Sequence, residues 1–336
     1  MARICAALCT SHSPYLYASP DDWEPARARR AAAGGIAKEV PVDSVQQNHE
    51  KFERCMTALA VLRNQLEAAR PDVLIMFGDD QSEQFGFDNY PAFAVYAGAD
   101  FSGFKVSGKF GLPVPGVARE DRPRTEEHWA TVPGAPAFAR HLIVELVKHD
   151  FDPAFSLELP RKEAGIGHAF MRPLVHLVPR FDIPTVPVFV NCYYGPQPTG
   201  RRCAQLGRAV RRAIEAMPDK LDVALIGSGG LWHMPMFPQA TLDGGFDRAI
   251  IAALVRGDCD GMAEVFDGYS PPADPLNLRR YSGGTDMVLG YGGGTGETRN
   301  WIAVAAAMEG RPGTIVDYVP VYASPVGLAF AMWSLS

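Results

Sequence analysis

Short apolar runs alternate with longer amphipathic stretches along the chain, and this pattern predicts a sheet flanked by helices. Short runs rich in β-branched side chains are typical of buried strands, whereas periodicity sustained over roughly ten residues or more favours a helix. The expected strands span residues 4–8, 73–77, 92–96, 155–159, 185–190, 223–226 and 314–321. The expected helices span residues 44–69, 135–149, 201–216, 245–256 and 298–308. We therefore expect an α/β fold with a central mixed sheet flanked by helices.

In two stretches the hydrophobic residues do not recur at the regular spacing of a helix or a strand. Residues 18–42 are polar, basic and alanine-rich, and we expect them to form a surface excursion. Residues 98–132 carry several prolines and glycines and are expected to form a long loop, which in a compact domain is often a lid or an interface. No internal repeat or low-complexity linker marks a boundary, so residues 1–336 are expected to form a single domain.

Polar turns follow several of the predicted strands. Their sequences are Thr-Ser-His-Ser-Pro at 10–14, Gly-Asp-Asp-Gln at 78–81, Asn-Cys-Tyr-Tyr at 191–194 and Gly-Ser-Gly-Gly-Leu-Trp-His at 227–233. Open α/β sheets place their functional sites at the carboxyl ends of their strands. We therefore expect these four turns to converge on one site.

Composition and charge narrow the class of protein. The chain has 47% hydrophobic and 21% charged residues, so it can bury a large core without disulfides. Its net charge of −6, with no run of Lys or Arg, argues against a nucleic-acid-binding face. Its start is too weakly apolar for a signal peptide, and no run approaches the roughly 18 apolar residues of a membrane span. Six scattered cysteines without a CxxC pair suit a reducing cytoplasm, so we expect a soluble cytoplasmic protein.

The eight histidines differ in their surroundings. His12 lies on a tight turn directly after a buried strand, where Pro14 stiffens the backbone, so it is either a functional residue or a helix cap. Four others lie on or beside polar faces and are expected at the surface: His128, His141, His149 and His176.

His49 lies within the predicted helix 44–69, whose apolar residues include Val45 and Phe52. Steps of four and three residues connect Val45, His49 and Phe52, so we expect His49 on the buried face. A buried imidazole needs a partner, because an unpaired buried polar group is costly. The partner is either a metal ion or another core side chain.

Glycine-rich turns precede three further candidates. His168 and His233 each follow glycines that permit close approach of a ligand, and a histidine there suits proton transfer near neutral pH, although a structural role is also open. Glu297 follows a glycine run and precedes a predicted helix, where it is either a cap or a ligand. Two imidazoles and one carboxylate with open coordination positions suit non-haem Fe(II) and activation of dioxygen.

In their order along the chain, the motifs at His12, Gln81, His168, His233 and Glu297 resemble those of class III extradiol ring-cleavage dioxygenases. The likeness is greatest to protocatechuate 4,5-dioxygenase beta subunits and the single-chain 3-O-methylgallate type, and it runs from residue 2 to about residue 330. The resemblance implies a single catalytic domain of that fold and Fe(II) ligation by His12 and Glu297. It also implies that His233 is the acid–base residue and that His168 contacts the substrate or assists proton movement.

The chain departs from this pattern at one position. Many members carry a second iron-binding histidine in an Asn-Asp-His segment, where this chain has Gln81, and an amide oxygen is a poorer iron ligand than imidazole. We expect His49 to supply the missing imidazole, with Gln81 as a substrate contact or weak ligand. Tyr193 and Tyr194 could line the pocket for the aromatic ring, although core packing is an equal alternative for each.

The activity implied by the resemblance is Fe(II)-dependent extradiol cleavage of a catechol-like or hydroxypyridone-like aromatic by O2, in aromatic compound catabolism. Two alternatives stay open. A metal-dependent hydrolase or decarboxylase could use the same ligands to activate water. A non-enzymatic binding protein is favoured by Gln81 but opposed by the joint presence of His12, His233 and Glu297. Homo-oligomer formation is also left open, and three arginines that could pair with a substrate carboxylate are expected at the surface: Arg172, Arg201 and Arg202.

Overall fold

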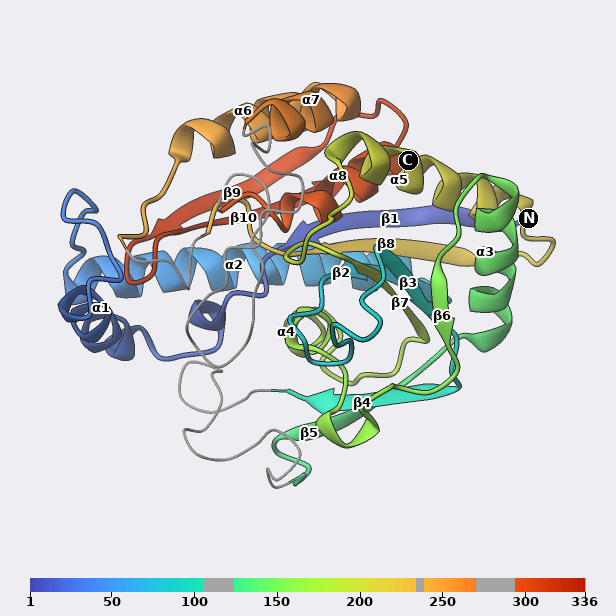
Figure 1. The fold of residues 1–336 in the computed structure, drawn as a ribbon, viewed down its shortest axis with the longest axis horizontal. Helices are drawn as coiled ribbons and strands as arrows, with labels where there is room; N and C mark the ends of the chain where they lie inside the picture. Colours follow the sequence, from blue (N-terminus) through green and yellow to red (C-terminus); the bar gives the residue numbers. More distant parts are fainter. Residues whose placement is uncertain (106–123, 234–238, 270–293, 336) are drawn as a thin grey trace.

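A computed structural model describes residues 1–105, 124–233, 239–269 and 294–335. Its centre is an eight-stranded mixed sheet with the order β6-β3-β7-β2-β8-β1-β10-β9 (Figure 1). The four inner strands β7, β2, β8 and β1 run parallel, and β10 pairs antiparallel with β1. The strands of this sheet are β1 (Arg3–Thr10), β2 (Val73–Gly78), β3 (Phe93–Tyr96), β6 (Ala154–Ser156), β7 (Thr185–Val190), β8 (Asp222–Ser228), β9 (Thr314–Val321) and β10 (Val326–Trp333).

Helices cover both faces of the sheet, because neighbouring residues of each inner strand point to opposite faces and are buried on both. On one face, Leu74 and Met76 of β2 belong to a hydrophobic cluster formed with α2 and α4. On the other, Ile75 and Phe77 belong to a cluster formed with α3, α5, α6, α7 and α8. The helices are α1 (Trp23–Ala32), α2 (Val45–Ala69), α3 (Pro136–Lys148), α4 (His168–Leu177), α5 (Gly200–Ala216), α6 (Gly244–Val255), α7 (Cys259–Tyr269) and α8 (Thr298–Ala307).

The predicted α/β class and the mixed sheet flanked by helices are confirmed. Strand β6 lies slightly earlier than the predicted strand 155–159 and ends at Ser156. Strand β10 was not predicted, because its apolar run has Val326 as its one β-branched residue and also contains Ala, Leu and Met, which favour helices. Helix α2 starts where expected, since Ser44 and Gln47 form a reciprocal capping box at its first turn. Among the described residues, no helix is long and apolar enough to cross a membrane.

Residues 18–42 and 98–132, where the sequence showed no regular hydrophobic spacing, both contain regular secondary structure. Within residues 18–42, α1 is mostly exposed, but Trp23 is fully buried and packs edge-on against Tyr15, so the description as a surface excursion was only partly right. Within residues 98–132, the predicted loop was wrong at both ends, because β4 (Asp100–Phe104) and β5 (Trp129–Pro133) pair as a small antiparallel sheet. Residues 106–123 between these strands lie outside the described part of the chain.

Candidate active site

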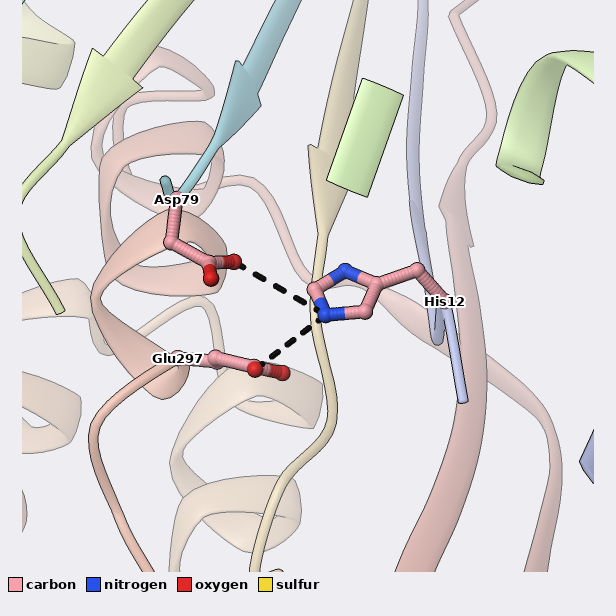
Figure 2. Close-up of side chains that lie close together, drawn as sticks. All are labelled: His12, Asp79 and Glu297. Atoms are coloured by element: carbon pink, nitrogen blue, oxygen red, sulfur yellow. Dashed lines mark hydrogen bonds and ion pairs between the residues drawn. The ribbon is translucent and has the colours of Figure 1, made fainter. Parts of the chain in front are cut away.

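Three buried side chains meet at the carboxyl edge of the parallel strands. His12 follows β1, Asp79 follows β2, and Glu297 immediately precedes α8. Nε2 of His12 lies 3.1 Å from Oε1 of Glu297 and 3.7 Å from Oδ1 of Asp79, and Figure 2 shows the ring facing both carboxylates. The ligand atoms of the three residues all lie within 4.8 Å of one another. None of the three is more than 3% exposed.

The orientation of the His12 ring is set by its second nitrogen. Nδ1 lies 2.9 Å from Oγ of Ser228, and the Ser228 hydroxyl also bonds the backbone carbonyl of Ala169. Because a carbonyl only accepts, the hydroxyl donates to Ala169 and accepts from Nδ1–H of His12. In the neutral ring, the lone pair of Nε2 therefore faces the two carboxylates, as ligation of a metal requires.

Glu297 is held from several sides. Its Oε2 accepts from the backbone N–H of Gly230 at 2.7 Å, and its Oε1 accepts from the hydroxyl of Tyr193. Gly229 adopts a φ of 148°, and a Cβ there would lie 2.7 Å from Cβ of Glu297, so glycine is required for the close approach. Burial opposes ionisation of Glu297, but the rings of His12 and His233 outweigh it and hold the pKa of this carboxyl well below its usual value.

Asp79 is the member of the cluster whose carboxylate has the fewest hydrogen-bond partners. Its Oδ2 accepts from the amide nitrogen of Gln81 at 3.2 Å, whereas its Oδ1 has no hydrogen-bond partner among the described residues. Burial, followed by repulsion from Glu297, raises the pKa of Asp79 to about 7. Burial disfavours a charged His12 ring, yet Glu297 and Asp79 raise the pKa of His12 above its usual value. An orphaned buried acceptor beside an imidazole and a second carboxylate fits a divalent metal ion.

His233 lies beside this cluster. Its Nε2 is 3.1 Å from Oε1 of Glu297 and 2.9 Å from the hydroxyl oxygen of Tyr193. Since the Tyr193 hydroxyl donates its one proton to the carboxylate, it accepts from Nε2–H of His233. Nδ1 of His233 has no hydrogen-bond partner within the described part of the chain. The backbone N–H of His233 donates to the carbonyl of Gly294 at 2.9 Å, which fixes the turn that carries the ring.

His168, the first residue of α4, reaches the same site. Its ring stands edge-on to that of His12, with the centroids 4.9 Å apart. Its Nδ1 lies 2.9 Å from Oε1 of Glu83, which also accepts from the backbone N–H of His168 at 3.1 Å. Burial outweighs the carboxylate of Glu83 and lowers the pKa of His168 to about 4. The ring is therefore neutral at pH 7.

Comparison with known proteins places this arrangement in a family. Residues 6–328 match the family model described as the catalytic LigB subunit of aromatic ring-opening dioxygenase. The chain belongs to the LigB family. This membership confirms the resemblance to class III extradiol dioxygenases that the sequence motifs indicated.

Curated relatives of the chain carry dioxygenase names. A 2,3-dihydroxyphenylpropionate/2,3-dihydroxicinnamic acid 1,2-dioxygenase of Photorhabdus laumondii is 30% identical over 69% of this chain and 57% of its own length. A gallate dioxygenase of Pseudomonas putida is 37% identical over 30% of this chain and 29% of its own length. The chain thus spans 57% of the length of the first relative and 29% of the length of the second. A crystal structure of an uncharacterized protein from Escherichia coli K12 has a TM-score of 0.49, with 16% identity over 98% of this chain and 99% of that one.

The inward orientation predicted for His49 in this LigB family member was wrong. Nε2 of His49 lies 2.7 Å from Oδ1 of Asp21, and the side chain is 44% exposed. The buried stripe of α2 runs through Asn48 and Cys55, whereas Val45, from which the spacing was counted, is 48% exposed. All eight histidines lie in the described residues, and His12 is the one that belongs to the candidate metal cluster.

The remaining sequence candidates lie at different distances from the cluster. Gln81 contacts Asp79, and the Tyr193 hydroxyl reaches into the site, whereas Tyr194 packs against Tyr90 with the ring centroids 4.5 Å apart. This contact agrees with the packing role that the sequence left open for Tyr194. The surface position expected for Arg172 was wrong, since it is 6% exposed and donates to the carbonyl of His12 at 3.0 Å. Arg201 is exposed at the start of α5, as expected, whereas Arg202 beside it is half-buried, with its guanidinium over the ring of Phe151.

Three site residues were missed by the sequence reasoning: Asp79, Glu83 and Ser228. Asp79 carried a usable signal, because it is the first residue after β2 and so lies at the edge where the other turns converge. Ser228 is the last residue of β8 and sits in register with Thr10 of β1, two positions before His12. Glu83 carried no signal, since it lies in an irregular segment and its partner His168 is 85 residues away along the chain.

Proposed function

We propose that this LigB family member is a non-haem Fe(II)-dependent extradiol dioxygenase that opens a small aromatic diol with O2. One observation supports this most strongly: a buried cluster able to hold a metal lies 3.1 Å from a histidine that can exchange a proton, in a chain of this family. Residues 1–336 would act as one catalytic domain. Six free cysteines agree with the expected cytoplasmic location.

When bound, Fe(II) would acidify a substrate hydroxyl and permit reaction of the ring with dioxygen. His12, Glu297 and Asp79 are the residues that would hold it. The remaining chemistry belongs to the chain itself: placing the diol, keeping water out and moving a proton. Burial of all three ligating side chains favours such a dry site.

Proton transfer falls to His233 in this proposal. Its ring borders the cluster and is 15% exposed, so a substrate hydroxyl at the metal would come within its reach. The hydroxyl of Tyr193 holds Nε2 of His233 on the side of Glu297. His168, neutral and fixed by Glu83, can accept or donate one hydrogen bond to the substrate without adding charge.

The test is anaerobic reconstitution with Fe(II), followed by oxygen-electrode and spectral assays over a panel of vicinal diols. The panel covers catecholic acids, gallates, dihydroxyphenylpropionate and a hydroxypyridone. We expect one O2 consumed per ring opened for at least one diol, with loss of activity in His12→Ala and retention in His49→Ala. Metal-loaded protein that consumes no O2 with any of these diols would refute the proposal. Product formation without O2 uptake would point to a hydrolase or decarboxylase instead.

A further inference from the structure

We propose that the metal centre is built from one imidazole and two carboxylates, with Asp79 as the third ligand and Gln81 as the residue that positions it. We infer from this donor set that the site accepts hard divalent cations, Mn2+ as readily as Fe2+. The inference deepens the proposed function, because it concerns the metal of the same site. It departs from the two-imidazole set that the sequence led us to expect.

The position of Asp79 is the first support. Its side chain is fully buried, Oδ1 is 3.7 Å from Nε2 of His12, and this oxygen has no hydrogen-bond partner in the described part of the chain. A buried carboxylate oxygen without a partner is unfavourable unless a cation compensates its charge. Figure 2 shows Asp79 and Glu297 facing the same nitrogen of His12, so one ion could contact all three.

The contact of Gln81 is the second support. Because a carboxylate only accepts hydrogen bonds, the Gln81 side chain turns its amide N–H towards Oδ2 of Asp79, at 3.2 Å. This hydrogen bond engages Oδ2 and leaves Oδ1 free to bind an ion. Gln81 thus orients a ligand, as residues behind metal ligands commonly do.

The placement of the histidines is the third support. All eight lie in the described residues, so every imidazole of the chain can be placed. His49 pairs with Asp21, Nδ1 of His168 with Glu83, and Nε2 of His233 with Tyr193. The cluster therefore has His12 as its imidazole and two carboxylates as its other ligands.

The donor set decides which ions fit. Carboxylate oxygens suit Mn2+ and other hard cations, whereas imidazole nitrogens favour Fe2+, Co2+ and Zn2+. Replacing one imidazole with a carboxylate also raises the ligand charge from −1 to −2, which a divalent ion neutralises. We therefore expect Mn2+ and Fe2+ to compete on nearly equal terms, whereas a two-imidazole site would favour Fe2+.

The experiment measures metal binding in the full-length protein without substrate or O2 turnover. Metal-free protein is titrated with Mn2+, and free Mn2+ is followed by electron paramagnetic resonance. Anaerobic Fe2+ competition is then read by elemental analysis. We expect one Mn2+ per chain, displaced by a comparable concentration of Fe2+. Asp79→Asn should weaken Mn2+ binding by at least about 100-fold, and Gln81→Ala by about 10-fold, in line with losses on removing ligands and the residues behind them.

Two further variants make the result decisive. His49→Ala is the matched control and should bind Mn2+ like the wild type. Asp79→Asn combined with Gln81→His offers an imidazole in place of the carboxylate and should shift the metal preference from Mn2+ towards Co2+.

Unchanged Mn2+ affinity in Asp79→Asn, or exclusion of Mn2+ by Fe2+ in the wild type, would overturn the inference. Circular dichroism of Asp79→Asn, which keeps the side-chain shape, verifies folding. A protein that binds Mn2+ as expected but opens no diol would refute the proposed function alone.

Discussion

Oγ of Ser228 lies 2.9 Å from Nδ1 of His12, and this contact decides which nitrogen of the imidazole faces the carboxylates. It follows from strand register: β1 and β8 run parallel, and Ser228 stands beside Thr10, just before the turn that carries His12. The sheet thus positions the residue behind the ligand as well as the ligand itself. A rigid strand end is a more accurate support for a metal site than a loop, because its backbone is fixed by ladder hydrogen bonds.

Ser228→Ala should weaken metal binding by about 10- to 100-fold, the usual cost of losing a residue that orients a ligating histidine. Without the hydroxyl, Nδ1–H has no acceptor there, and the His12 ring is free to change tautomer. Mn2+ titration of metal-free protein measures the loss. Ser324→Ala is the matched control, because Ser324 is also buried but bonds Arg30 instead. Equal metal affinity in the two variants would mean that Ser228 does not orient His12.

Glu83→Gln should lower kcat by about 10-fold and leave KM nearly unchanged, because the carboxylate strengthens the basicity of His168 while the amide only holds the ring. Glu83→Ala should raise KM as well, since the ring then loses its fixed orientation. Steady-state kinetics with the best diol separates the two effects. Glu158→Gln changes an exposed glutamate and should match the wild type. A kcat in Glu83→Gln equal to that of the wild type would show that the charge of Glu83 has no part in the reaction.

The strand ends that form the site were predictable, whereas the individual ligands were only partly so. Parallel strands end at one edge of the sheet, so the turns at His12 and His233 could be expected to meet. The choice between Asp79 and Gln81 depends on loop conformation beyond β2, which neither periodicity nor propensity specifies.

The error at His49 has a different physical cause. The buried stripe was placed on the wrong face at the amino end of the helix, because it was counted from Val45, which faces solvent together with His49. Spacing gives the positions of residues relative to one another around a helix, but the buried face also depends on which residue the count starts from. Asn48, which is 2% exposed, occupies the buried face that the spacing assigned to His49.

His49→Ala should leave metal affinity unchanged and cost less than about 1 kcal/mol of stability, because its ion pair with Asp21 is exposed to solvent. His12→Ala should abolish tight binding of Mn2+ and Fe2+. Elemental analysis after desalting distinguishes the two variants, and urea unfolding of the metal-free proteins gives the stability difference. Loss of bound metal in His49→Ala would restore the two-imidazole centre that the sequence suggested.

Asp247→Asn should change how stability depends on pH. Asp247 is fully buried in α6, where Oδ1 accepts from the backbone N–H of Trp232 and Oδ2 is 2.7 Å from the hydroxyl of Tyr318. Burial raises the pKa of this carboxyl to about 7, above the value of about 4 expected in the unfolded chain. Between these values the folded state holds a proton that the unfolded state has released. Stability from this group therefore falls as pH rises from about 4 to about 7 and is constant above that.

The asparagine variant mimics the protonated carboxyl, so its stability lacks this decrease with rising pH. Its stability relative to the wild type should therefore rise between about pH 5 and pH 8, by an amount of the order of a few kcal/mol at most. Urea unfolding in the presence of a chelator measures the difference at both pH values. Asp243→Asn is the control, because the hydrogen bond from Tyr269 lowers the pKa of Asp243, so this carboxyl is ionised in both the folded and the unfolded state at pH 5 and at pH 8. The stability of Asp243→Asn relative to the wild type should therefore be the same at both pH values. If the difference between Asp247→Asn and the wild type is the same at both pH values, Asp247 does not titrate in this range.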